Sequence, residues 1–148
     1  MSTTSPSLSW LHIVPVGTSQ LSNAGWQPGQ KLPSKRQLID RLQKGDPRKA
    51  SAEFNGLSYF IDAGQCTHVH LLVTNTPEAQ LCADALAHYL QRRHIHVTKA
   101  PISGLLPQPS SGGDQESFRR GIRQFREKIF RAMNKAQTRK QNVLLNAT

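Results

Sequence analysis

Short apolar runs alternate with helix-like segments along this chain, and this alternation restricts its fold more than any other feature. The runs with the length and aliphatic content of buried strands are Trp10–Val16, His68–Thr74, His94–Ile102 and Asn142–Ala147. Strands that alternate with helices are typical of right-handed crossovers and a parallel sheet. The pattern therefore predicts one α/β domain over residues 10–148, with an open, mostly parallel sheet flanked by helices.

Caps and apolar periodicity predict the helices between these strands. Ser34, with Gln37 three residues later, forms a capping box that starts a helix. The other helices are expected after the Asp46-Pro47 turn, after Thr76, and over residues 114–140. Because residues 17–33 are polar, we expect a loop there. The predicted order is strand, loop, two helices, then strand, helix, strand, helix, strand.

The chain is strongly basic, with a formal net charge of +10 at pH 7. This charge favours polyanionic partners, because cations gain from contact with phosphates. Much of the excess lies in the predicted helix at 114–140. Two interpretations of that helix stay open: a solvated face, or a surface that contacts RNA or another anionic ligand.

Several features bear on the compartment of the protein. No apolar stretch approaches the roughly 20 residues of a membrane span, so no membrane partner is expected. Residues 1–9 are polar and lack the basic start and apolar core of a signal peptide, and we expect a flexible segment there. Cys66 and Cys82 form neither a CxxC pair nor a disulfide framework. Together these features favour a cytoplasmic protein.

Small polar residues follow the carboxyl ends of three predicted strands. They are Gly17, Thr18, Ser19 and Asn23; Thr74 and Asn75; and Asn146 and Thr148. Ligands of open parallel sheets bind beyond this edge, where glycine admits a ligand to the backbone and hydroxyls and amides donate to phosphate. The sequence thus predicts a phosphate-bearing, nucleotide-like ligand. The alternative is that these residues are ordinary caps and turns, which we prefer for Thr76.

Neither a Walker A motif nor a GxGxxG motif is present, so we expect neither ATP hydrolysis nor a nicotinamide cofactor, and no cofactor is assigned. A zinc site is a further alternative, because Cys66, His68 and His70 alternate, as do His94 and His96, and each set can share a strand face. These residues begin strands, opposite the expected ligand edge. No metal is therefore expected.

Five blocks of the sequence occur in an order that is typical of one family. They are HIVPVGTSQLSNA (12–24), SAEFNGL (51–57), HLLVTNTPEAQLCADALAHYL (70–90), PISGL (101–105) and NVLLNAT (142–148). Together they resemble the CARF (CRISPR-associated Rossmann fold) domain of type III CRISPR systems, over nearly all of the chain after Leu11. The resemblance implies a Rossmann-like fold and a homodimer that binds a cyclic oligoadenylate across its two-fold axis.

The resemblance also implies roles for particular residues. Gly17, Thr18 and Ser19 would contact phosphate and ribose, and the pocket would further be lined by Thr74, Asn75, Ser103 and Gly104. Some members of this family are ring nucleases, in which the serine matching Ser19 positions the attacking ribose 2′-hydroxyl and a later lysine stabilises phosphate charge.

The chain departs from the family pattern at two points. The sequence stops at Thr148, before that lysine, so the expectation is a truncated product or a minimal sensor without an effector domain. Asn75 stands where the family usually has Asp.

Three functions follow, in order of preference. The first is a cyclic oligoadenylate sensor without catalysis. The second is a metal-independent ring nuclease that uses Ser19, with Lys99 or a helix arginine in place of the missing lysine. The third is an RNA-binding regulator that uses the helix at 114–140. The third is weakened because that helix lacks aromatic residues on its polar face, and single-strand binders usually offer stacking platforms.

Overall fold

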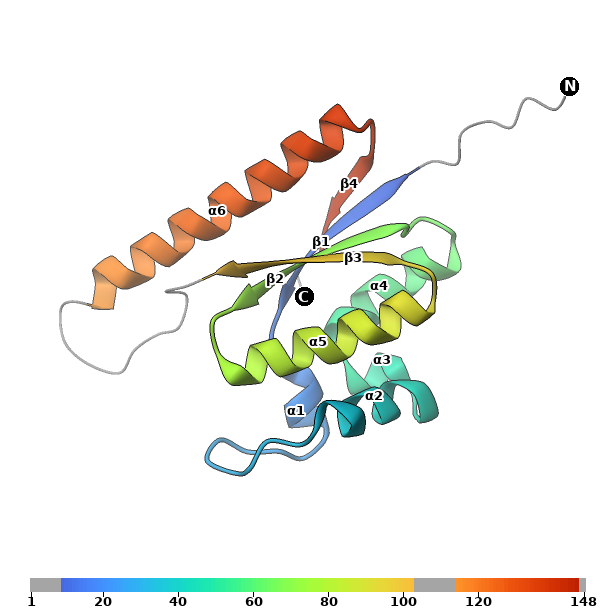
Figure 1. Cartoon of the computed structure of the whole chain (residues 1–148), viewed down its shortest axis with the longest axis vertical. Coiled ribbons are helices and arrows are strands. Elements are labelled where there is room, and N and C mark those ends of the chain that lie inside the picture. The colour runs from blue at the N-terminus through green and yellow to red at the C-terminus, as the bar shows by residue number, and fades with distance from the viewer. Residues whose placement is uncertain (1–8, 103–113, 147–148) are drawn as a thin grey trace, which may run out of the picture.

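A computed structural model describes residues 9–102 and 114–146 of the chain (Figure 1). Within them, four strands form one parallel sheet in the order β3-β2-β1-β4. The strands are β1 (Trp10–Val16), β2 (His68–Thr74), β3 (His96–Ile102) and β4 (Asn142–Leu145). The predicted single α/β domain with a parallel, Rossmann-like sheet is confirmed.

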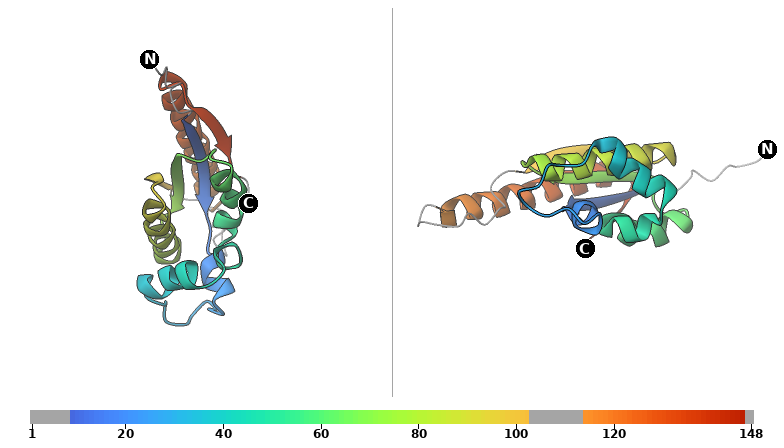
Figure 2. Two further views of the ribbon diagram at one scale, coloured as in Figure 1. Left: turned by 90° about the vertical axis from the view of Figure 1, so that its right-hand side faces the viewer. Right: turned by 90° about the horizontal axis from the view of Figure 1, so that it is seen from below.

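Helices cover both faces of this sheet. The described residues form α1 (Ser19–Asn23), α2 (Lys35–Lys44), α3 (Pro47–Ala50), α4 (Ala52–Asp62), α5 (Pro77–Arg92) and α6 (Asp114–Thr138). Helices α2, α4 and α5 lie on one side of the sheet, and α6 crosses the other side (Figures 1 and 2). Over the described ranges, no helix has both the length and the apolarity needed to span a membrane.

The helix starts predicted from caps are confirmed. The Ser34 hydroxyl accepts a hydrogen bond from the Gln37 N–H, and the Gln37 side chain accepts one from the Ser34 N–H. This reciprocal pair satisfies two amide groups that have no partner inside α2. The Thr76 hydroxyl caps α5 by accepting from the Ala79 N–H. The cap interpretation of Thr76 is therefore correct.

Several element boundaries differ from those predicted. Helix α6 ends at Thr138 and β4 at Leu145, and three further differences have a local cause. The polar stretch 17–33 contains the short helix α1. The helix expected after Asp46-Pro47 is broken at Ser51, whose extended backbone (φ −138°, ψ 123°) lets its hydroxyl cap α4 at the Phe54 N–H. Strand β3 begins at His96, because His94 has a positive φ of 64° and closes the turn after α5.

The sheet buries a separate apolar cluster on each face. Val14 of β1 lies in one cluster with Leu57 of α4 and Leu86 of α5. Ile13 lies in the other, with Ala132 and Ala136 of α6. Successive residues of β1 face opposite sides, so this central strand is apolar on both, as a buried parallel strand requires. Helix α6 places Ala132 and Ala136 against the sheet, together with the half-buried Phe125 and Ile129.

Candidate functional site

The strand order places a topological switch point between β1 and β4. The chain moves outward from β1 through β2 to β3 and then returns across the sheet, so that β4 pairs with the other side of β1. Gly17 follows β1, and Asn146 follows β4 and donates its N–H to the Ile13 carbonyl at 2.8 Å. Open parallel sheets bind ligands at the carboxyl edge beside such a point.

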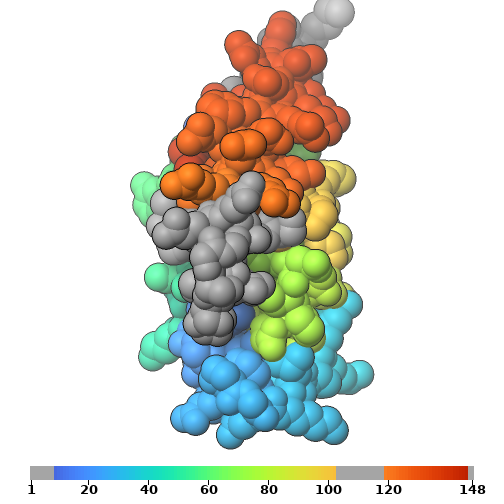
Figure 3. Space-filling model, turned by 90° about the vertical axis from the view of Figure 1, so that its left-hand side faces the viewer, coloured from blue at the N-terminus to red at the C-terminus, as the bar shows by residue number. Residues whose placement is uncertain are grey.

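The predicted residues from β2 lie at the same edge. Val16 pairs with Val73, so Thr74, the last residue of β2, and Asn75 after it lie beside Gly17. Gly17 and Asn75 are exposed, and Thr74 is half-buried. Figure 3 views the molecule from the side toward which β2 and β3 point, with α6 in orange above and the segment around α1 in blue below. The structure therefore brings together the ends of β1, β2 and β4.

Thr18 offers an unused hydroxyl at this edge. It precedes α1 but makes no side-chain capping bond, and within the described residues its hydroxyl has no hydrogen-bond partner. The residue is exposed. A hydroxyl of this kind can donate to a phosphate oxygen without breaking any bond of the fold.

Glu53 is a site residue that the sequence reasoning missed. Its side chain is buried, with 4% of the residue exposed, and reaches from α4 to the turn after β1. Glu53 Oε1 accepts from the Gly17 N–H at 2.8 Å, and Oε2 accepts from the Ser19 hydroxyl at 3.0 Å and the Ser51 hydroxyl at 3.1 Å. Three donors compensate the burial of this carboxylate. Gly17 and Ser19, predicted as phosphate donors, are thus already engaged inside the protein.

Ser19 is held by two hydrogen bonds. Its hydroxyl donates to Glu53, and its oxygen accepts from the Ala52 N–H at 3.0 Å. A serine hydroxyl has one donor and two lone pairs, so one lone pair stays available for a ligand O–H. Ser19 can therefore accept a hydrogen bond from a ligand hydroxyl, but it can donate one to a phosphate only by giving up its bond to Glu53.

The remaining predicted residues divide into two groups. The Asn23 amide donates to the Lys49 carbonyl at 3.0 Å and to the Ala50 carbonyl at 3.4 Å, so this side chain ties α1 to α3 rather than facing the ends of the strands. Ser103, Gly104 and Thr148 lie outside the described residues.

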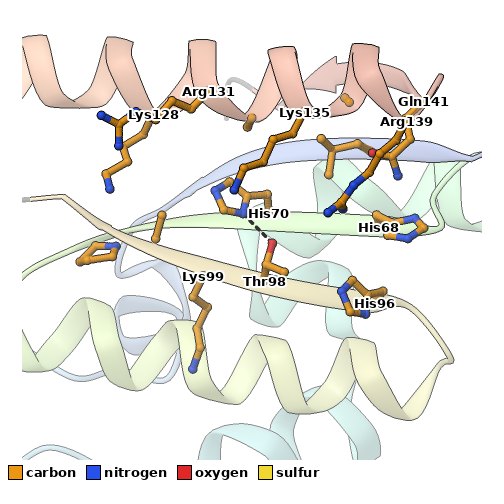
Figure 4. Close-up of a pocket in the computed structure, with 15 residues that line it drawn as sticks. His68, His70, His96, Thr98, Lys99, Lys128, Arg131, Lys135, Arg139 and Gln141 are labelled. Carbon is orange, nitrogen blue, oxygen red and sulfur yellow. Dashed lines mark hydrogen bonds between the residues drawn. The ribbon is translucent and has the colours of Figure 1, made fainter.

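The histidines and Cys66 do not share one face, contrary to the alternation in the sequence. Cys66 packs in the cluster on the α5 side, where burial raises the pKa of its thiol to about 12. His68 and His70 face the opposite side, toward α6 (Figure 4). The chain turns between Cys66 and β2, which breaks the alternation expected of one continuous strand. Among the described residues, no three His, Cys, Asp or Glu side chains are grouped to hold a metal ion.

Comparison with known families places this chain in a family and covers most of the sheet. A family model described as CRISPR-associated protein (Cas_APE2256) matches residues 48–148. The chain belongs to this family of CRISPR-associated proteins. The Cas_APE2256 match includes Glu53 and the strands β2 to β4, whereas β1 and the Gly17 turn precede it. No match was found among curated proteins.

Proposed function

We propose that this CRISPR-associated protein is a sensor that binds cyclic oligoadenylate at the carboxyl edge of its sheet. The observation that carries the proposal is the exposed Gly17-Thr18 turn at the switch point between β1 and β4. Thr74, Asn75 and Asn146 extend this polar edge on either side. Membership of the Cas_APE2256 family supports a role in CRISPR defence, and the resemblance to CARF domains supports the ligand.

A homodimer is part of the proposal. A cyclic oligonucleotide with two-fold symmetry presents the same groups twice, and an isologous dimer offers the same surface twice. Each copy would then contact half of the ring through its own Thr18 and Asn75. The net charge of +10 favours the approach of a polyphosphate to either copy.

Glu53 limits which groups of the turn after β1 can contact the ligand. Since its carboxylate already accepts from Gly17 and Ser19, we assign it to ordering the turn, not to contacting the ligand. The first phosphate contacts then fall to the unused Thr18 hydroxyl and to the exposed Asn75 amide. Asn75 Oδ1 accepts from the Gln80 amide at 3.2 Å, which orients the Asn75 side chain.

A ring nuclease is the second candidate, and the Ser19–Glu53 hydrogen bond is the observation in its favour. The free lone pair of Ser19 could accept from a ribose 2′-hydroxyl and align that oxygen with the adjacent phosphorus. The new 2′-O–P bond would form as the P–O5′ bond breaks, leaving a 2′,3′-cyclic phosphate. Solvent would take the proton of the 2′-hydroxyl and return one to O5′, which leaves as a 5′-hydroxyl. In this scheme Ser19 is a positioning residue, since the nucleophile belongs to the ligand.

One experiment separates these candidates. The full chain is mixed with labelled cyclic tetra- and hexa-adenylate, binding is followed by fluorescence polarisation, and products are separated by chromatography. The sensor retains the ring intact, whereas the nuclease converts it to linear fragments. Thr18→Ala removes one hydrogen bond to the ring from each copy of the dimer. Because each bond to a charged group contributes about a factor of ten, binding should weaken about a hundredfold.

Ser22→Ala is the matched control for Thr18→Ala. It removes a hydroxyl from α1 whose one hydrogen bond within the described part of the chain is to the Ser19 carbonyl, at 3.2 Å. Ser22→Ala should bind the ring as the wild type does. Equal binding by Thr18→Ala and the wild type, or no binding by the wild type, would show that the ring does not use this edge.

A further inference from the structure

A groove lies between α6 and the sheet face beneath it, toward the amino ends of β2 and β3 (Figure 4). It encloses a cavity of about 420 Å³. Its α6 wall carries Lys128, Arg131, Lys135 and Arg139, and its floor carries His68, His70, His96 and Thr98 from β2 and β3. We call this the basic groove. Its own lining contains none of the residues to which the cyclic ligand is assigned.

The α6 wall presents a continuous stripe of positive charge. Its four cations are spaced by three, four and four residues, so they lie on one side of the helix. At 1.5 Å of rise per residue, the stripe from Lys128 to Arg139 is roughly 16 Å long. None of the four takes part in a salt bridge within the described part of the chain, and no carboxylate lines the groove. An anionic ligand would supply the negative charge that the described residues do not provide in the groove.

The cations of α6 act on the floor of the groove. The pKa of His70 is lowered by burial and, in addition, by the positive charges of Lys135 and Lys128. The pKa of His68 is lowered by burial, by His96 and by Arg139. The positive potential of α6 therefore extends to the floor of the groove, where phosphates would be stabilised by it.

The floor of the groove offers flat rings opposite the cations. The His68 and His96 rings meet edge to face with centroids 5.3 Å apart, and His70 Nδ1 lies 2.6 Å from the Thr98 hydroxyl oxygen. Histidine is among the side chains on which unpaired bases stack. Helix α6 places no aromatic residue in the lining of the groove, but the sheet provides rings for stacking.

The shape of the groove favours an extended ligand. Its cations are spread over three turns of α6 and do not converge on one point, as they would around a single phosphate. A second cavity of about 450 Å³ shares Pro101, Lys128 and Arg131 with the groove and continues to Asn75, past Glu127. Cavities of this volume hold small ligands, so an unpaired nucleotide can enter them and the cross-section of a duplex cannot.

We propose that the basic groove binds single-stranded nucleic acid, with phosphates along α6 and bases against the histidines of β2 and β3. RNA and DNA strands share this chemistry, and the experiment distinguishes them. The proposal does not depend on the cyclic oligoadenylate site.

The test uses the full chain and three labelled probes: an RNA strand, the DNA strand of the same sequence, and the RNA annealed to its complement. Affinity is measured by fluorescence polarisation over a series of salt concentrations. Each phosphate neutralised on a single strand contributes about −0.7 to the slope of log K against log salt, so four contacts predict a slope of about −3. The single strands should bind more tightly than the duplex. A tighter RNA than DNA complex would identify RNA as the ligand, and the reverse would identify DNA.

The decisive variant is Lys135→Gln with Arg139→Gln, which removes two exposed cations of the stripe. It should weaken single-strand binding about tenfold or more and reduce the slope to about −1.5. The matched control is Lys35→Gln with Arg36→Gln, which removes the same charge from α2 on the opposite side of the sheet. Thr18→Ala, at the strand edge, should leave single-strand binding unchanged.

His96→Ala tests the stacking half of the proposal. The residue is exposed, so its loss should leave the fold intact while reducing the quenching of a fluorescent adenine analogue placed in the strand. The proposal is wrong if the control double variant loses as much affinity as the groove variant, since net charge alone would then explain binding. It is also wrong if the duplex binds as tightly as the single strand.

Discussion

Ser19 and Glu53, 34 residues apart in the sequence, are joined by a hydrogen bond of 3.0 Å from the serine hydroxyl to Glu53 Oε2. The other oxygen of the same carboxylate accepts from the Gly17 N–H at 2.8 Å. One buried side chain of α4 thus holds both the backbone and a side chain of the turn that leads out of β1. The shape of the candidate ligand edge consequently depends on Glu53.

Glu53→Ala should destabilise the protein by about 3 kcal/mol, because it leaves Gly17, Ser19 and Ser51 without their common acceptor. Glu53→Gln should cost about half as much, since its amide oxygen can still accept from Gly17 and the hydroxyls can rotate. Urea unfolding followed by circular dichroism measures both losses. A Glu53→Ala protein as stable as the wild type would contradict the assigned role.

Two helix caps provide a matched pair of stability predictions. Ser51 and Ser34 each accept from the amide three residues later, but Ser51 is fully buried and also donates to Glu53, whereas Ser34 is exposed. Ser51→Ala should therefore cost about 2 kcal/mol and Ser34→Ala about 1 kcal/mol of unfolding free energy. Equal losses in a urea titration would show that the bond to Glu53 contributes nothing.

His12 makes stability depend on pH. Burial lowers its pKa below the ordinary 6.5, and the backbone bond to Gln65 only partly opposes this. Below about pH 6.5 the unfolded chain therefore binds a proton that the folded protein does not. The stabilising contribution of His12 is complete above that pH and is lost as the pH falls toward the lower folded pKa.

The matching measurement is the free energy of unfolding between about pH 7 and pH 5. It should fall with acidification, and the fall should be shallower in His12→Gln. Part of the dependence on pH should remain in that variant, because the pKa values of His68 and His70 are also lowered. An identical slope in both proteins would rule out a contribution from His12.

The two thiols should be unreactive in the folded protein. Cys66 and Cys82 are buried, and burial raises the pKa of each thiol to about 12. Roughly one thiol in ten thousand is then ionised at about pH 8, and the thiolate is the reactive form. Titration with a chromogenic disulfide should give little reaction before denaturant is added and two thiols per chain afterwards. Rapid reaction of native protein would show that the core opens readily.

The sequence alone determined the four strands, the longer helices and their order, but not α1 or the break between α3 and α4. Strand positions follow from runs of consecutive apolar residues, and the starts of α2 and α5 follow from Ser34 and Thr76, because a cap bonds to an amide only three residues away. A ligand edge at the strand ends could also be anticipated, since parallel strands direct their carboxyl ends to one side. These features depend on neighbouring residues or on a general rule of topology.

Only the tertiary structure decided which side chains meet across the sheet. Glu53 reaches Gly17, Asn23 bonds to α3, and His70 faces Lys135 across the basic groove. No local sequence pattern relates the members of these pairs. Each depends on the register of the strands and on the path of a crossover helix. Those are set by the packing of the two apolar clusters as a whole, and periodicity along the chain carries no information about them.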